Sequence, residues 1–285
     1  MTPSEGKIAV EGGSIWYEMA GNSAGTPLIF LHGGPGFPHY SFKCLELLRD
    51  ERPVVFYDQL GCGKSDRPTD LGLWRVDRFV QELKSLVDSL DFEEFHLIGH
   101  SWGGGLAAQY ALTYPKGIQK FILSSPLLST HWWIEDANRL KKTLPGEVQV
   151  AITKNESNNT TDSEEYGHAI DEFYKRYWCR LDDLPPEVTQ TQKEANRDIY
   201  KYMWGPSEFS CTGNLKEFDL TDELHTLVMP VLYTCGRFDE ATPETILAFQ
   251  KMTPHATLVV FEKSAHLAQL EEQSAFIATV RNFLK

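Results

Sequence analysis

The sequence predicts an α/β protein whose central sheet is mostly parallel and is covered by helices on both faces. From about residue 27, short apolar runs of strand length alternate with segments in which apolar residues recur at helical spacing. Strands and helices that alternate in this way form βαβ units, which build parallel sheets. The alternation lapses between about residues 127 and 227 and then resumes, which indicates a helical insertion in a continuous α/β pattern.

An N-terminal hairpin and six further strands are expected in chain order. Residues 7–20 form two short alternating runs around Gly12 and Gly13, a pattern typical of a β-hairpin. The later strands are expected at PLIFLH (27–32), PVVFYD (53–58), FHLIG (95–99), KFILSS (120–125), VLYTCG (231–236) and TLVVFE (257–262). Apolar spacing and stop signals predict helices near 39–50, 74–90, 101–114, 243–252 and 268–284.

The domain organisation follows from the same alternation. We expect a core made of residues 1–126 and 228–285, with residues 127–227 forming a helical cap inserted in that core. Within the cap, residues 154–165 include no apolar side chain, which predicts a mobile loop.

Composition argues against two classes of partner. The chain has 285 residues, with 27 Lys and Arg against 40 Asp and Glu, hence a formal net charge of −13. Nucleic-acid binding needs basic side chains that neutralise phosphates, so no nucleic-acid partner is expected. The longest apolar runs are of strand length, well short of the ~20 residues that a membrane-spanning helix requires, so no membrane segment is expected.

The N-terminus and the cysteines indicate a cytoplasmic location. Residues 1–13 have neither the basic segment nor the apolar segment of a signal peptide. The cysteines are odd in number and lack C-x-x-C spacing, which is typical of free thiols in a reducing compartment. They are Cys44, Cys62, Cys179, Cys211 and Cys235.

Ser101 is the candidate nucleophile. It lies at the centre of a G-x-S-x-G pattern (99–103), after an expected strand and before an expected helix. A sharp strand-to-helix turn lifts the serine hydroxyl clear of the sheet, and small residues on both sides let the backbone make that turn. The pattern alone is weak, but its strand–turn–helix context favours a nucleophile over an incidental serine in a tight turn.

Asp239 and His266 are the expected partners of this serine. A serine hydroxyl becomes a nucleophile when a base takes its proton, and a carboxylate must hold that base. Asp239 follows the expected strand 231–236, and His266 follows 257–262, so the chain order is Ser, Asp, His. Asp58 and Asp66 are rival acids, but both precede the serine and follow earlier strands.

The glycine-rich segment HGGPG (32–36) is the expected oxyanion loop. Glycines let a backbone N–H approach a developing negative charge, and Gly34 is the candidate donor. The amide after the nucleophile, that of Trp102, is the expected second donor. No metal-ligand spacing such as H-E-x-x-H is present, so neither a metal nor a cofactor is expected.

Together these motifs resemble the α/β-hydrolase superfamily and, more narrowly, the proline iminopeptidase family of serine peptidases. The resemblance covers nearly the whole chain: HGGPG (32–36), DQLGCGKS (58–65), GHSWGG (99–104), GRFDEATP (236–243) and SAH (264–266). HGGPG together with D-Q-x-G-x-G-x-S is specific to that family, whereas G-x-S-x-G and the triad order occur throughout the superfamily. The resemblance implies the α/β-hydrolase fold with an inserted cap.

The resemblance also implies how a substrate is recognised. The family removes an N-terminal residue, often proline, and reads the free α-ammonium with acidic side chains. The matching positions are Glu208 in the cap and Glu240 beside the triad aspartate. A carboxylate in a partly dry site does bind an ammonium by a charge-assisted hydrogen bond. The Trp102 side chain is expected to narrow the pocket around a small first residue.

The sequence thus predicts a serine aminopeptidase that releases an N-terminal residue, proline or another small residue, from short peptides through an acyl-enzyme. An amino-acid amide hydrolase would need the same triad and the same two carboxylates. An esterase or lactonase would need the triad without Glu208 or Glu240. A non-catalytic receptor that holds a small molecule under the cap is the alternative from another class. Oligomeric state is left open.

Overall fold

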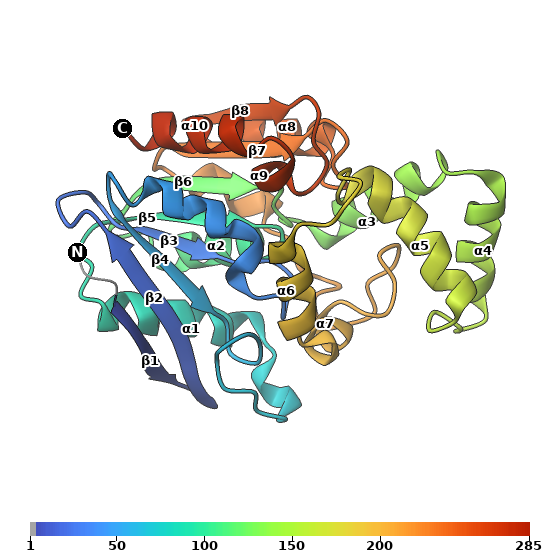
Figure 1. Cartoon of the computed structure of the whole chain (residues 1–285), viewed down its shortest axis with the longest axis horizontal. Coiled ribbons are helices and arrows are strands. Elements are labelled where there is room, and N and C mark those ends of the chain that lie inside the picture. Colours follow the sequence, from blue (N-terminus) through green and yellow to red (C-terminus); the bar gives the residue numbers. More distant parts are fainter. Residues whose placement is uncertain (1–3) are drawn as a thin grey trace.

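The computed structural model describes residues 4–285 and has an eight-stranded sheet at its centre (Figure 1). The strands lie in the order β1-β2-β4-β3-β5-β6-β7-β8. β1 and β2 form an antiparallel hairpin, β2 pairs antiparallel with β4, and every later pairing is parallel. The bounds are β1 Ser4–Val10, β2 Gly13–Gly21, β3 Leu28–Leu31, β4 Pro53–Asp58, β5 Phe95–His100, β6 Ile118–Ser124, β7 Val231–Gly236 and β8 Ala256–Phe261. The predicted mostly parallel α/β sheet is confirmed.

Helices cover both faces of this sheet. Because successive side chains of a strand point to opposite faces, Ile29 packs with one apolar cluster and Leu28 and Phe30 with another. The first cluster includes side chains of α1, α2 and α8, and the second includes side chains of η1 and α10. These helices and the two short ones beside them span η1 His39–Leu48, η2 Leu71–Leu73, α1 Val76–Ser89, α2 Trp102–Thr113, α8 Pro243–Met252, α9 Ala268–Glu271 and α10 Gln273–Leu284.

The remaining helices all lie between β6 and β7 in the chain. They are α3 Thr130–Lys141, α4 Gly146–Ser157, α5 Glu164–Tyr177, α6 Pro186–Glu194, α7 Arg197–Met203 and η3 Thr221–Thr226. Figure 1 shows α4 and α5 projecting beyond one end of the sheet, while α6 and α7 lie closer to it. Side chains of α3, α4 and α5 form a small apolar cluster of their own, whereas Ile199 and Met203 of α7 join the main core.

The mobile loop predicted at 154–165 is wrong in extent. Helix α4 continues through Ser157 and α5 begins at Glu164, so only a short turn separates them. The polar side chains of this segment satisfy one another: the Asn155 oxygen accepts from Thr160 and Ser163, and Lys154 pairs with Glu165. Polarity here reflects helix capping and surface ion pairs.

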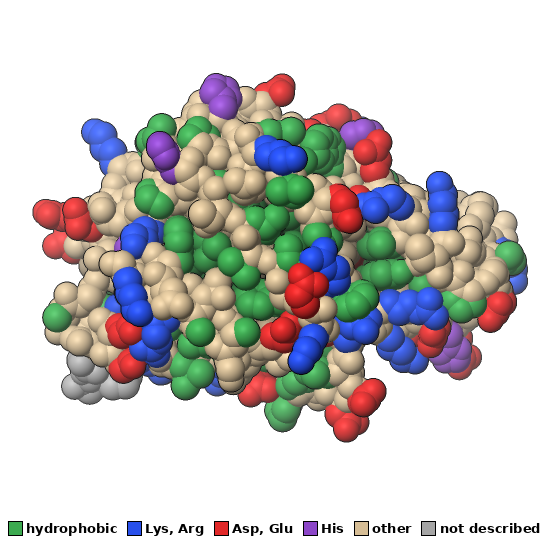
Figure 2. All heavy atoms as spheres, turned by 90° about the horizontal axis from the view of Figure 1, so that it is seen from above, with side chains coloured by type: hydrophobic (Ala, Val, Ile, Leu, Met, Phe, Trp, Pro, Cys, Tyr) green, Lys and Arg blue, Asp and Glu red, His purple; other side chains and the backbone are tan. Residues whose placement is uncertain are grey.

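On the face seen in Figure 2, acidic and basic side chains are interspersed and no continuous basic surface is visible. Within residues 4–285, no helix is long and apolar enough to cross a membrane.

Candidate active site

Ser101 lies at a sharp turn between β5 and α2. Its backbone has φ 55° and ψ −124°, a conformation that residues other than glycine rarely adopt. A Cβ on Gly99 would lie 2.3 Å from the Gly103 carbonyl oxygen, and one on Gly103 would lie 2.2 Å from the Leu31 carbonyl oxygen. Only glycine fits at these two positions, so the G-x-S-x-G pattern holds the serine at the end of the strand.

His266 and Asp239 form a buried pair after β8 and β7. Nδ1 of His266 lies 2.8 Å from Oδ1 of Asp239, and both side chains are almost fully buried. Asp239 also accepts hydrogen bonds from the Ser125 hydroxyl at 2.6 Å and from the amides of Ala241 and Gly236. These donors fix the carboxylate, which leaves Nε2 of the imidazole free to face the cavity.

The loop that carries His266 is tied down by two glutamates at the break between α9 and α10. Glu271 accepts from the Ala265 amide, and Glu272 accepts from the Ser264 hydroxyl. Glu272 itself has non-helical backbone angles, so the helix predicted over 268–284 is divided there. The break places both carboxylates against the loop.

The cavity around these groups has a volume of about 480 Å³. Ser101, His266, Gly34, Glu208 and Glu240 all line it, although they are widely spaced in the chain. This volume lies in the usual range for a small-molecule site. Among the described residues no group of three or more histidine, cysteine, aspartate or glutamate side chains is arranged to hold a metal ion.

Gly34 lines the same cavity as Ser101, and Trp102 directly follows Ser101 in the chain. Gly34, with φ 117°, lies in the loop after β3, and a Cβ there would lie 2.5 Å from the Gly36 amide nitrogen. Trp102 is the first residue of α2, where the N–H has no acceptor within its own helix. The amides of Gly34 and Trp102 remain the expected oxyanion donors.

Gln59 connects these two segments, and sequence reasoning missed it. Its backbone amide donates to Nε2 of His32 at 2.8 Å, and its side-chain amide donates to the His32 carbonyl at 3.0 Å. Its side-chain oxygen accepts from the Trp102 indole at 2.9 Å. The Trp102 ring is thus fully buried beneath the site, and the expectation that it narrows the pocket is wrong.

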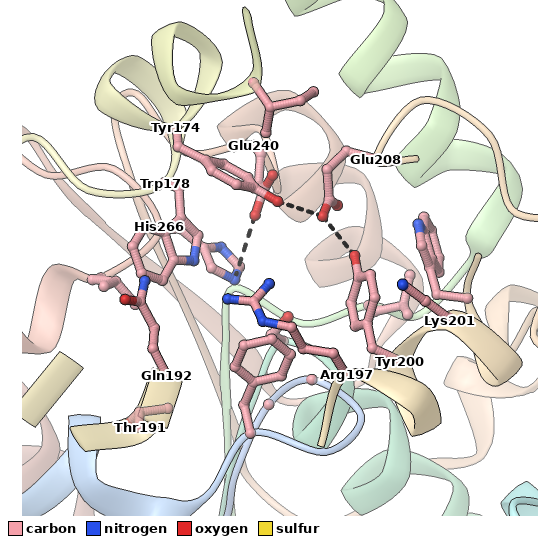
Figure 3. Close-up of a pocket in the computed structure, with 18 of the residues that line it drawn as sticks. Tyr174, Trp178, Thr191, Gln192, Arg197, Tyr200, Lys201, Glu208, Glu240 and His266 are labelled. Atoms are coloured by element: carbon pink, nitrogen blue, oxygen red, sulfur yellow. Dashed lines mark hydrogen bonds and ion pairs between the residues drawn. The ribbon is translucent and has the colours of Figure 1, made fainter. Parts of the chain in front are cut away.

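Glu208 is held by two tyrosines from neighbouring helices. The hydroxyls of Tyr174, on α5, and Tyr200, on α7, each donate to Oε1 of Glu208 at 2.6 Å (Figure 3). Sequence reasoning missed both tyrosines, because no motif marks them. One carboxylate oxygen is thus satisfied by protein, and the other has no hydrogen bond to a side chain or backbone group of residues 4–285.

Glu240 is buried beside the candidate base. Its Oε1 lies 3.9 Å from Nε2 of His266, and its Oε2 is a buried oxygen with no hydrogen-bond partner among residues 4–285. Burial raises the pKa of Glu240 to about 8; the charges of Glu208 and Asp239 act in the same direction, and His266 opposes them. A cation that entered the cavity would therefore meet a carboxyl group in need of a partner.

The charges around His266 also alter its protonation. Burial acts to lower the pKa of His266, but Asp239, and then Glu240 and Glu208, outweigh burial, so this pKa lies above its ordinary value. Asp239 is the largest of these favourable influences. The imidazole is therefore a stronger base than a histidine in water.

The two rival acids have other partners. Asp58 is fully buried and accepts from the His39 ring and from the Lys64 amide, so it organises the loop after β4. Asp66 pairs with Lys7 at the surface. The His100 ring packs against His266 at 4.5 Å between ring centroids and does not contact Asp239.

Comparison with known proteins agrees with this geometry. The family model described as the alpha/beta hydrolase fold matches residues 26–273. A proline iminopeptidase from Heyndrickxia coagulans is 50% identical over 283 residues, which covers 99% of this chain and 98% of that protein. The chain belongs to the proline iminopeptidase family of α/β hydrolases.

Solved structures place it in the same family. A crystal structure of proline iminopeptidase from Mycobacterium smegmatis superposes with a TM-score of 0.89 at 33% identity, covering 99% of this chain and 97% of that one. The crystal structure of VinJ superposes with a TM-score of 0.93 at 34% identity, covering 99% and 98%. Each of these two structures therefore matches nearly the whole of this chain.

Proposed function

We propose that this chain is a prolyl aminopeptidase, a serine hydrolase that releases an N-terminal proline from short peptides. The observation that carries the proposal is the buried, unpartnered oxygen of Glu240, in the same cavity as Ser101 and His266 and close to Glu208. A hydrolase for neutral esters or lactones has no use for two carboxyl groups there. A free α-ammonium supplies the charge and the hydrogen-bond donors that both carboxyl groups lack.

The proposed reaction proceeds through an acyl-enzyme. Ser101 Oγ attacks the scissile carbonyl while His266 Nε2 takes the hydroxyl proton, and the carbonyl oxygen becomes an oxyanion. The amides of Gly34 and Trp102 bind that oxyanion. His266 then gives its proton to the leaving amine as the C–N bond breaks, and Asp239 stabilises the imidazolium throughout.

A water molecule completes the cycle. The oxygen of the water attacks the prolyl ester of Ser101 while His266 takes a proton from that water. When the ester bond breaks, His266 gives this proton to Ser101 Oγ. Proline leaves as the free amino acid. The pyrrolidine nitrogen, protonated and charged, is held by Glu240 and Glu208 in both steps.

Three further assignments belong to this proposal. Residues 127–227 act as the cap over a core of residues 1–126 and 228–285, which agrees with the separate apolar cluster of α3, α4 and α5. The substrate is a short peptide, because a cavity covered by cap helices leaves little room for a folded protein. The chain acts in the cytoplasm, in keeping with five free cysteines, four of them buried.

The test compares free and N-acetylated prolyl anilides with Glu240→Gln and Glu208→Gln. Each substitution removes one charge–ammonium hydrogen bond, so we expect the ratio of kcat/KM for free over acetylated substrate to fall about 10- to 100-fold. Glu244→Gln, at an exposed glutamate on α8 outside the cavity, is the matched control. An unchanged ratio in both variants would contradict ammonium recognition.

A second comparison of substrates distinguishes the prolyl aminopeptidase from an amino-acid amide hydrolase. An amino-acid amide hydrolase would use the same triad and glutamates, so prolinamide should be compared with a prolyl dipeptide on the wild-type protein. A preference for the dipeptide supports the aminopeptidase, and a preference for the simple amide supports the amidase.

A further inference from the structure

The active-site cavity carries positive as well as negative side chains. Glu208, Glu240 and Asp171 line it, and so do Arg197 and Lys201. The two basic residues are four apart on α7, which places them on the same face of that helix. Figure 3 shows the Arg197 side chain extending from α7 into the pocket.

Neither basic side chain has a partner within residues 4–285. No hydrogen bond or ion pair joins Arg197 or Lys201 to any described residue, although three carboxylates line the same cavity. Some other basic residues of the segment between β6 and β7 have acidic neighbours: Arg139 pairs with Asp136, and Lys154 pairs with Glu165. Arg197 and Lys201 are the lysine and arginine side chains that line this cavity, so both are available to a ligand that enters it.

We propose that Arg197 and Lys201 bind the C-terminal carboxylate of the substrate, so that the enzyme prefers prolyl peptides of two or three residues with a free C-terminus. This rests on the proposed function, which places the peptide's ammonium at Glu208 and Glu240. The cavity then matches a short zwitterion, with acidic groups for one end and basic groups for the other.

Peptide length sets which substrates can reach both ends. Each added residue moves the carboxylate at most about 3.6 Å further from the ammonium. A long peptide carries its carboxylate out of the cavity and loses the contact with α7. An arginine also suits this role, because its planar guanidinium can bind a carboxylate through two parallel hydrogen bonds.

The net negative charge of the protein acts against any preference for a substrate with a free C-terminal carboxylate. With a net charge of −13, the long-range field attracts a cationic peptide amide more strongly than a zwitterionic peptide. A preference for the free carboxylate must therefore come from local basic groups. Arg197 and Lys201 are both exposed, so we expect their contribution to carboxylate binding to be modest and to weaken as salt is added.

The experiment measures kcat/KM for Pro-Ala and for Pro-Ala-amide with each protein variant. The ratio of the two values cancels any difference in the fraction of folded enzyme. We expect the wild type to favour Pro-Ala, and Arg197→Gln and Lys201→Gln each to lower the ratio about two- to fivefold. Lys193→Gln is the matched control, since this exposed lysine of α6 lies outside the cavity.

Prolyl anilide, which has no carboxylate, is the third substrate of the wild type. It distinguishes failure of the inference about α7 from failure of the proposed function. If the anilide is cleaved but the Pro-Ala to Pro-Ala-amide ratio is the same in the wild type, both α7 variants and Lys193→Gln, the inference about α7 is overturned alone. If the wild type cleaves neither the anilide nor Pro-Ala, the proposed function is overturned and the inference falls with it.

Discussion

At the scale of single residues, the site depends on side chains that never touch the substrate. Gln59 is almost fully buried and contacts both the loop that carries Gly34 and the indole of Trp102. The two amides proposed to bind the oxyanion come from these two segments. Gln59 is therefore a positioning residue, which sets the distance between the donors.

Replacing Gln59 by leucine should impair turnover more than binding. We expect kcat for prolyl anilide to fall about 10- to 100-fold with little change in KM, because small displacements of catalytic groups are costly. Gln81→Leu, on the exposed face of α1, is the control. A lowered melting temperature with unchanged kcat would show that Gln59 serves only the fold.

The proximity of Glu240 to His266 has a pH signature. His266 must be neutral to accept the serine proton, and its raised pKa sets the acid limb of kcat/KM above pH 6.5. Negative charge on Glu240 favours the imidazolium form. Glu240 gains this charge as the pH approaches its own raised pKa of about 8. In Glu240→Gln the charge is absent at every pH, so the pKa of His266 falls and the acid limb of kcat/KM moves to lower pH.

Glu240→Gln should show this shift with a substrate that carries no ammonium, such as p-nitrophenyl acetate. The pH profile of kcat/KM is the measurement, and Glu244→Gln serves again as the control. An acid limb at the same pH in Glu240→Gln and the wild type would mean that the two groups do not interact.

At the scale of elements, the turn between β5 and α2 leaves no room for side chains around the nucleophile. The nearest atoms to a Cβ on Gly103 are backbone carbonyls of Leu31 and His32, which cannot rotate away. Gly146, at the start of α4, has no atom within 4 Å of its Cβ position. These two glycines begin helices in very different surroundings.

Alanine substitutions at these positions should therefore differ in stability. Gly103→Ala should lower the free energy of unfolding by about 1–3 kcal/mol, because β3 and α2 must separate to fit the methyl group. Gly146→Ala should change it by less than about 0.5 kcal/mol. Urea unfolding curves of both variants are the measurement, and equal stability would contradict the packing argument.

Most helices and strands of the core could be predicted from the sequence, but some of their boundaries could not. The strands of the sheet were predictable because they are short apolar runs, as in β5, and the helices beside them because their apolar residues recur at helical spacing, as in α1. Residues 154–165 were not, because polarity alone cannot distinguish a loop from a helix end whose side chains cap one another. Similarly, the break at Glu272 depends on hydrogen bonds to a loop that only the fold brings near.

At the scale of the whole molecule, some residues of the candidate site could be predicted from the sequence and others could not. Ser101, Asp239 and His266 were predictable because parallel strands collect their carboxyl ends at one edge of a sheet. The contacts of Tyr174 and Tyr200 with Glu208 depend on how α5 and α7 pack, and no motif encodes that packing. The same holds for the unpartnered cations of α7.

The most direct test of this account is the hydrolysis of prolyl anilide by the purified wild type and by Ser101→Ala, with N-acetylprolyl anilide as the blocked substrate. We expect the wild type to hydrolyse the free amine much faster than the blocked substrate, and Ser101→Ala to hydrolyse neither while its melting temperature is unchanged. Equal hydrolysis of both anilides, or activity retained in Ser101→Ala, would contradict it.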